Sequence, residues 1–135
     1  MRHRKKKLKL NRTAEHRKAL LLSLATEIFK HEMIKTTLAK AKMARGLIER
    51  LISLAKVNSL ANHRRIVSFI SNKEIVKKLE REIAPNFSVR QGGYTQIIKL
   101  GRRHGDSAEM AIIKLIKKEL PQKDESSAIK SEVSN

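Results

Sequence analysis

TLAKAKMARGLIERLISLAK, residues 37–56, is the segment with the clearest helical pattern in this sequence. Its apolar residues recur every three or four positions, as they do on the buried face of a helix. Lys40, Lys42 and Arg45 fall mostly outside that stripe. The pattern therefore predicts a helix that packs one face against a sheet and a first helix, through Ala44, Leu47, Ile48, Leu51, Ile52 and Ala55.

A helix and a strand are predicted before this segment. Thr13 is a suitable N-cap, and apolar residues recur with helical spacing over residues 20–29. Residues 33–36 are short and half β-branched, which is typical of a strand. Either Thr36 or Thr37 could cap the helix that follows.

Two shorter helices are predicted after the central one. Residues 60–70 have helical spacing, with the Arg64–Arg65 pair free to face outward. Ser71 and Glu74 have the spacing of a capping box, in which two side chains bond each other's backbone N–H groups, and so predict the start of a fourth helix. Pro85 is predicted to end that helix, because it lacks a backbone N–H and clashes with the preceding turn.

Two β-rich runs, residues 94–100 and 110–116, follow and are joined by a turn-like segment at 101–106. Their apolar residues do not alternate strictly, which suits strands covered on both faces or covered by helices on one. Aromatic residues make up only 3% of the chain, so the core is expected to be aliphatic. The pattern predicts helices packed on a sheet of few strands.

The positive charge of the chain is densest at its N-terminal end. The 135 residues include 31 Lys or Arg against 13 Asp or Glu, a net charge of +18. Residues 1–18 hold nine of these cations and one acid, Glu15, and they bury too little apolar surface to fold alone. We therefore expect a basic arm over residues 1–12 and a single globular domain over residues 13–116. Residues 117–135 carry four basic and four acidic groups, which predicts a polar, disordered tail.

This charge balance favours a nucleic acid as the partner, because a dense negative surface offsets the repulsion among the cations. The chain has no Cys, which fits a reducing compartment. It also lacks an apolar span of about twenty residues, so we expect no membrane crossing and a cytoplasmic location.

A helix-turn-helix or nucleoid-type DNA-binding protein is the main alternative to an RNA-binding protein. Residues 60–70 and 73–84 are short, adjacent helices on this reading, as in that motif. The second helix carries Glu74, Glu80 and Glu82, and acids on a helix disfavour its entry into a DNA groove. Folded RNA that is recognised by shape and backbone is the better fit.

An RNA-cleaving enzyme is also disfavoured. His63 and His104 lie beside arginines, a cationic setting that could serve a nuclease, yet neither has a carboxylate cluster nearby in the sequence that could hold Mg²⁺. The sequence contains no HExxH motif, no Walker-type loop and no GxGxxG motif. We expect no catalytic residue, no cofactor and no metal.

Several ordered blocks resemble a known family. The basic start MRHRK is followed by KLNRT at 9–13 and HRK at 16–18, and the other blocks are IKTTLAKAK at 34–42, LISLAK at 51–56, GGYT at 92–95 and GDSAEMA at 105–111. Together they cover residues 1–116 and resemble the bacterial large-subunit ribosomal protein seventeen family.

This resemblance implies an α+β fold, a small two-layer domain in which helices pack on a short three-stranded mixed sheet, with a basic extended N-terminal arm. It implies a structural constituent of the large ribosomal subunit, without enzymatic activity, that binds and stabilises folded ribosomal RNA. The expected partners are large-subunit ribosomal RNA and neighbouring ribosomal proteins near the polypeptide exit region. No membrane or small-molecule substrate is implied.

The expected RNA contacts are basic and polar groups that bind phosphates, which position a protein on RNA without reading its sequence. They are Arg2, His3, Arg4, Lys5, Lys6, Lys7, Lys9, Asn11, Arg12, His16, Arg17, Lys18, Thr36, Thr37, Lys40, Lys42, Arg45, Arg64, Arg65, Arg90, Gly92, Gly93, Tyr94, Arg102, Arg103 and His104.

Overall fold

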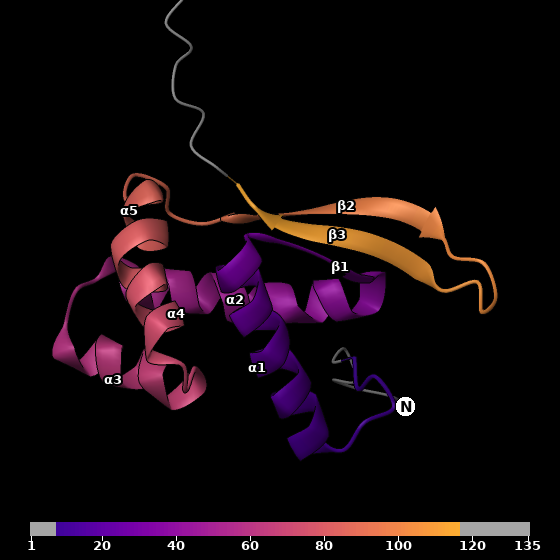
Figure 1. Cartoon of the computed structure of the whole chain (residues 1–135), viewed down its shortest axis with the longest axis horizontal. Coiled ribbons are helices and arrows are strands. Elements are labelled where there is room, and N and C mark those ends of the chain that lie inside the picture. The colour runs from indigo at the N-terminus through magenta and orange to yellow at the C-terminus, as the bar shows by residue number, and fades with distance from the viewer. Residues whose placement is uncertain (1–7, 117–135) are drawn as a thin grey trace, which may run out of the picture.

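A layer of helices covers one face of a three-stranded sheet in the computed structural model, which describes residues 8–116 (Figure 1). The elements are α1 (Ala14–His31), β1 (Met33–Thr37), α2 (Leu38–Lys56), α3 (Leu60–Phe69), α4 (Lys73–Lys78), the π-helical η1 (Leu79–Ile83), α5 (Ala84–Asn86), β2 (Thr95–Arg102) and β3 (Glu109–Leu115). The predicted helix at 37–56 is confirmed as α2. Thr13 is confirmed as the N-cap of α1, where its hydroxyl accepts a hydrogen bond from the His16 N–H.

The sheet is antiparallel throughout, with strand order β1-β3-β2. Ile113, on the central strand, pairs with Ile34 on β1 and with Ile97 on β2. The expectation of a mixed sheet is therefore wrong. β2 and β3 are joined by a hairpin and are therefore antiparallel. β1 pairs with the other edge of β3 and also runs antiparallel to β3, so no two neighbouring strands are parallel.

The β2–β3 hairpin is longer than the sequence predicts. β2 continues through Arg102, inside the segment expected to be a turn. A bulge shifts the register between Lys99 and Gly101, and Gly101 adopts a φ of 89°. A residue with a side chain rarely adopts this conformation, so the glycine lets the strand continue past the bulge.

The core lies between α2 and the sheet, and α2 also contacts α1. On β3, Ala111, Ile113 and Leu115 are buried, while the alternate residues Ile112 and Lys114 are only half-buried. The strands are thus covered by helices on one face, which is one of the two arrangements predicted. The buried residues of α2 are Leu38, Ala41, Ala44, Ile48, Leu51, Ile52 and Ala55, so of the predicted stripe only Leu47 is half-buried.

The start and the end of the fourth helical segment differ from the prediction. Asn72, not Ser71, caps α4, because its side-chain oxygen accepts a hydrogen bond from the Glu74 N–H at 2.9 Å. Pro85 does not end the segment, because a π-helical turn widens the backbone before it and the Ala84 N–H bonds the Leu79 carbonyl. Pro85 then lies at the start of α5, where its missing N–H has the smallest effect.

Candidate nucleic-acid interface

Apart from Arg45 and Tyr94, the predicted RNA contacts within residues 8–116 lie at two ends of the molecule. At one end, the base of the arm, the start of α2 and the turn of the β2–β3 hairpin lie close together (Figure 1). A groove there is lined by Leu8 from the arm, by Thr37, Leu38, Ala39 and Lys42 from the start of α2, and by Ala108 and the acidic Glu109 from the hairpin. We call this end the arm-side surface; its predicted contacts are Lys9, Asn11, Arg12, His16, Arg17, Lys18, Thr36, Thr37, Lys40, Lys42, Arg102, Arg103 and His104.

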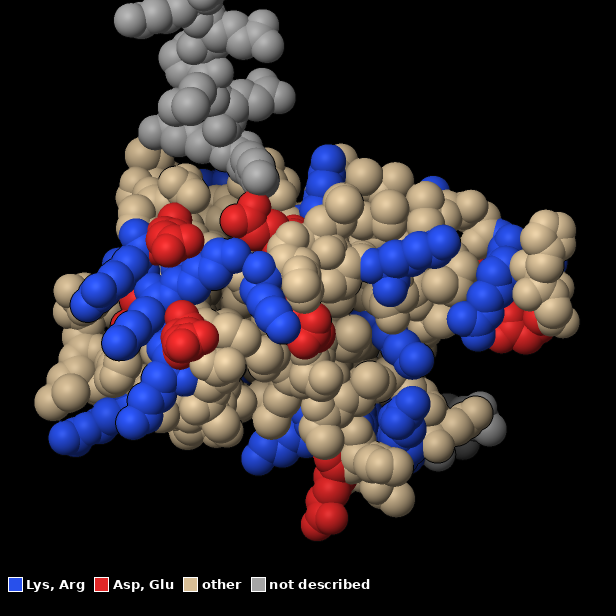
Figure 2. All heavy atoms as spheres, in the orientation of Figure 1, with Lys and Arg blue, Asp and Glu red and all other residues tan. Residues whose placement is uncertain are grey.

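The other end, formed by α3, α4, η1, α5 and the loop before β2, carries the predicted contacts Arg64, Arg65, Arg90, Gly92 and Gly93. Arg64 and Arg65 are exposed on α3, as predicted. Acidic side chains accompany the basic ones at this end of the visible face (Figure 2). Acidic atoms also lie at the hairpin end of the visible face (Figure 2), so the difference between the two ends comes from the sequence of residues 2–7, whose five Lys or Arg residues are expected to strengthen the attraction for a polyanion at the arm-side surface.

The arm predictions Arg2, His3, Arg4, Lys5, Lys6 and Lys7 lie outside the described residues. The base of the arm is described and forms a turn. The Arg12 N–H donates to the Lys9 carbonyl at 3.1 Å, and Leu10 and Asn11 between them have φ values of 54° and 50°. The Arg17 guanidinium donates to the same carbonyl at 3.3 Å.

The start of α2 has backbone N–H groups available for an anion. Thr37 is the N-cap, but its side chain forms no capping hydrogen bond, and no acid lies in the first turn. The N-terminus of a helix carries a partial positive charge, which favours phosphate groups. Lys40 and Lys42 lie within the first five residues of α2. Lys40 is half-buried and Lys42 is exposed, so two ammonium groups are carried near this end of the helix.

The turn of the hairpin is stabilised by an ion pair. Arg103 donates to both carboxylate oxygens of Asp106, with Nε to Oδ1 at 2.8 Å and Nη2 to Oδ2 at 2.6 Å, and the Ala108 N–H donates to Oδ1 at 3.2 Å. The hydrogen bonds from Arg103 hold the pKa of Asp106 well below its ordinary value, and Asp106 raises the pKa of Arg103. Arg103 therefore shapes the turn, while Arg102 and His104 are exposed beside it.

Tyr94, one of the predicted RNA contacts, lies in the core. Only 2% of the residue is exposed, and its ring packs edge-on against Phe87 with a centroid separation of 5.1 Å. Its hydroxyl accepts a hydrogen bond from Lys56 Nζ at 3.2 Å and donates to the Arg90 carbonyl at 3.3 Å. A hydrogen bond from Ser53, supported by Lys56, lowers the pKa of Tyr94. The residue is part of the core.

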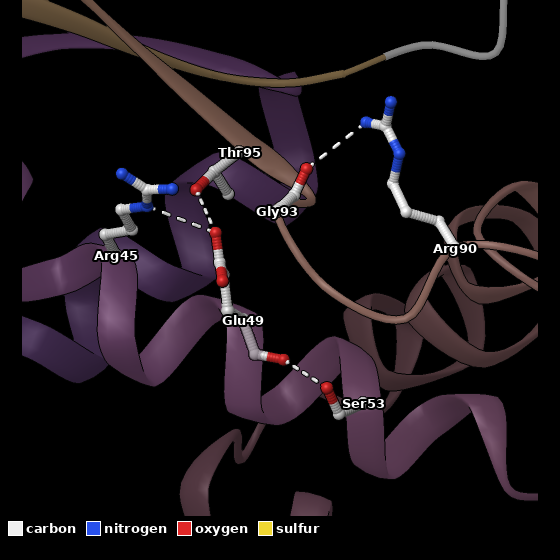
Figure 3. Close-up of polar contacts among 6 residues, drawn as sticks. All are labelled: Arg45, Glu49, Ser53, Arg90, Gly93 and Thr95. Carbon is white, nitrogen blue, oxygen red and sulfur yellow. Dashed lines mark hydrogen bonds and ion pairs between the residues drawn. The ribbon is translucent and has the colours of Figure 1, made fainter.

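The loop before β2 is closed by a hydrogen bond between two of its own residues. Arg90 Nη1 donates to the Gly93 carbonyl at 3.2 Å, and Gly93 has a φ of 63° (Figure 3). Gly92 is exposed and Gly93 half-buried. The glycine pair is thus a turn closed by Arg90, which leaves fewer of the Arg90 donors for a phosphate.

Glu49 is a residue that the sequence did not single out, and it connects α2 to the sheet. Its Oε1 accepts hydrogen bonds from Thr95 Oγ1 at 2.9 Å and from Arg45 Nε at 3.2 Å (Figure 3). Thr95 is buried, so its hydroxyl depends on this carboxylate. The spacing of Arg45 and Glu49, four residues apart on one helix, is the only signal in the sequence for this arrangement. The predicted contact Arg45 is therefore partly neutralised.

We predict that Glu49→Ala lowers the free energy of unfolding by about 1–3 kcal/mol, because it leaves the buried Thr95 hydroxyl without its acceptor. Glu49→Gln should cost less, because the amide oxygen can still accept this hydrogen bond. Urea unfolding measures both, with Glu82→Ala on the exposed surface as the control. Equal stabilities for Glu49→Ala and Glu82→Ala would contradict this role.

His63 has a carboxylate neighbour that the sequence did not reveal. Its Nδ1 lies 2.7 Å from Oε1 of Glu80, which joins α3 to the π-helical turn η1. One of the acids that argued against DNA binding thus makes an ion pair within the protein when His63 is protonated.

Within residues 8–116, no helix has the length and apolar character needed to cross a bilayer. The chain matches a family model described as ribosomal protein L17 over residues 20–116. The match therefore begins within α1 and includes every later helix and strand of the described fold, over well more than half of the chain. This chain belongs to the ribosomal protein L17 family, whose members are RNA-binding structural proteins of the large ribosomal subunit.

Proposed function

We propose that this protein binds and stabilises folded ribosomal RNA through phosphate contacts from its basic arm and its arm-side surface. The observation that supports this most directly is the convergence of the arm base, the start of α2 and the hairpin turn around one groove. These segments are far apart in sequence, and each brings cationic groups to the same end of the molecule.

The mechanism is electrostatic. Lys and Arg side chains that meet phosphates release the counterions condensed on the RNA, and this release drives binding and makes it strongly dependent on salt. Because phosphate contacts do not read bases, the shape of the folded RNA decides where the protein binds. The globular domain then determines where the arm enters the RNA.

The resemblance to the family supports three finer proposals. The protein acts in the cytoplasm within the ribosome, it lies near the polypeptide exit region, and it contacts neighbouring ribosomal proteins there. We propose no catalytic role, in keeping with a structural family. Arg64, Arg65, Arg90 and the Gly92–Gly93 turn are proposed as a second, weaker set of RNA contacts at the opposite end.

Cosedimentation with ribosomal subunits after a high-salt wash tests this function. We expect the protein to remain with the large subunit. The double variant Lys40→Gln, Lys42→Gln should be retained less, because it removes two cations from the arm-side surface. A matched control is Lys73→Gln, Lys77→Gln, which removes two exposed cations from α4 at the opposite end.

Two results would count against the proposal. Equal retention of the two double variants would mean that the arm-side surface is not the main contact. Loss of the parent protein from the large subunit, with recovery on chromosomal DNA, would favour the DNA-binding alternative.

A further inference from the structure

The turn at the base of the arm has an unusual backbone. Its two central residues, Leu10 and Asn11, both have positive φ values, and the Arg12 N–H closes the turn on the Lys9 carbonyl. Turns with two positive φ values normally use Gly, Asn or Asp at those positions. Asn11 fits this preference, but Leu10 does not, since a branched side chain disfavours the left-handed region. Such a conformation persists only where its surroundings hold it.

Two contacts hold this turn. Arg17, in the first turn of α1, reaches back and donates from Nη1 to the Lys9 carbonyl at 3.3 Å, the same oxygen that closes the turn. On the other side, Leu8 lines the groove with Leu38 and Ala108. Arg17 is half-buried, whereas its neighbour Lys18 is exposed. Arg17 is thus engaged within the protein at the point where the arm leaves the domain.

We propose that Arg17 is a positioning residue that holds the turn at residues 9–12, so that the arm starts from the arm-side surface in a set direction. This inference rests on the proposed RNA-binding function. A preset direction reduces the conformational freedom that the arm loses when it meets RNA, so the same phosphate contacts give a tighter complex. Arg17 then acts through the arm rather than as one more phosphate contact.

The two roles of Arg17 predict different results. A direct phosphate contact would make Arg17→Ala equivalent to Lys18→Ala, since each removes one cation. A positioning residue would make Arg17→Ala more damaging, because the arm contacts weaken as well. Arg17→Gln also removes the charge, and its side chain ends two bonds before that of arginine, so its amide does not reach the Lys9 carbonyl and the variant should behave like Arg17→Ala.

The experiment is a salt titration of binding to large-subunit ribosomal RNA fragments, with the full chain and with a chain lacking residues 2–7. In the full chain we expect Arg17→Ala and Arg17→Gln to bind about tenfold more weakly than Lys18→Ala, a larger loss than the removal of one phosphate contact explains. In the shortened chain the three variants should bind alike, because there is no arm left to position.

Equal affinities of the three variants in the full chain would overturn the inference. So would an Arg17→Ala deficit of the same size in the shortened chain, since it would then arise without the arm. A circular dichroism melt of each variant checks that the domain is folded. If Arg17→Ala does not fold, Arg17→Gln takes its place in the comparison with Lys18→Ala. A parent chain that fails to bind the RNA would refute the proposed function itself, whereas binding with equal variants would refute only the positioning role.

Discussion

Deletion of residues 2–7 is expected to reduce the slope of log affinity against log salt by about 2–4 units, taking about 0.7–0.9 for each of three to five phosphate contacts. The deleted segment contains five Lys or Arg residues and His3. Affinity at moderate salt should fall by two orders of magnitude or more, while preference among RNA sequences should change little. Binding of large-subunit RNA fragments over a range of salt concentrations measures both.

The end point of this deletion follows from the structure. Leu8 lines the groove beside α2, and the Lys9 carbonyl closes the turn at the base of the arm, so both residues stay in the shortened chain. α1 begins only at Ala14, and the melting temperature should therefore remain near that of the parent. Deletion of residues 117–135 is the matched control, because it removes four basic and four acidic groups and so no net charge. An unchanged salt slope after the arm deletion would refute the electrostatic role of the arm.

Leu51→Ala is expected to lower the free energy of unfolding by about 2–5 kcal/mol, the range observed when a large core side chain is replaced by a small one. Leu51 is fully buried in the cluster between α2 and the sheet. Its loss removes apolar contacts and leaves a cavity that rigid neighbours fill only in part. Denaturant unfolding measures the change.

The matched control removes the same atoms from the surface. Leu60 is 65% exposed at the start of α3, so Leu60→Ala should change stability by no more than about 0.5 kcal/mol. If Leu51→Ala unfolded at the same denaturant concentration as Leu60→Ala, the assignment of this face of α2 to the core would be wrong.

The helices α1 and α2 were predictable because each is long enough for its apolar spacing to be unambiguous. α2 follows its predicted range within a residue, and the Thr13 cap was visible from the residue type alone. The relative direction of the strands was not predictable from the sequence. Strand pairing depends on which distant segments meet, and the residue pattern of a single strand does not contain that information. The course of the chain past Pro85 depends on a π-helical turn, for which the sequence has no clear signal.

The candidate site was predictable as a set of cations but not as an arrangement. Charge counting cannot tell that Arg103 bonds Asp106, that Arg45 bonds Glu49, or that Arg17 reaches the arm. These are local pairings of long side chains, which depend on backbone geometry. The burial of Tyr94 was not predictable, because a single aromatic residue beside two glycines is equally compatible with a surface position and with the core.

Because β3 lies between β1 and β2, the last-made of the three strands described within residues 8–116 is the one that joins the other two. Until β3 emerges, the strands β1 and β2 have no partner, and the apolar face of α2 that packs against the sheet remains exposed to water. Long-range pairing of this kind is a late and slow step in folding. A growing chain would therefore present its cationic arm long before it has a folded domain. A chain that ends before β3 would carry the charges of the arm without a completed sheet. Synthesis of β3 and completion of the sheet are thus coupled in the described fold.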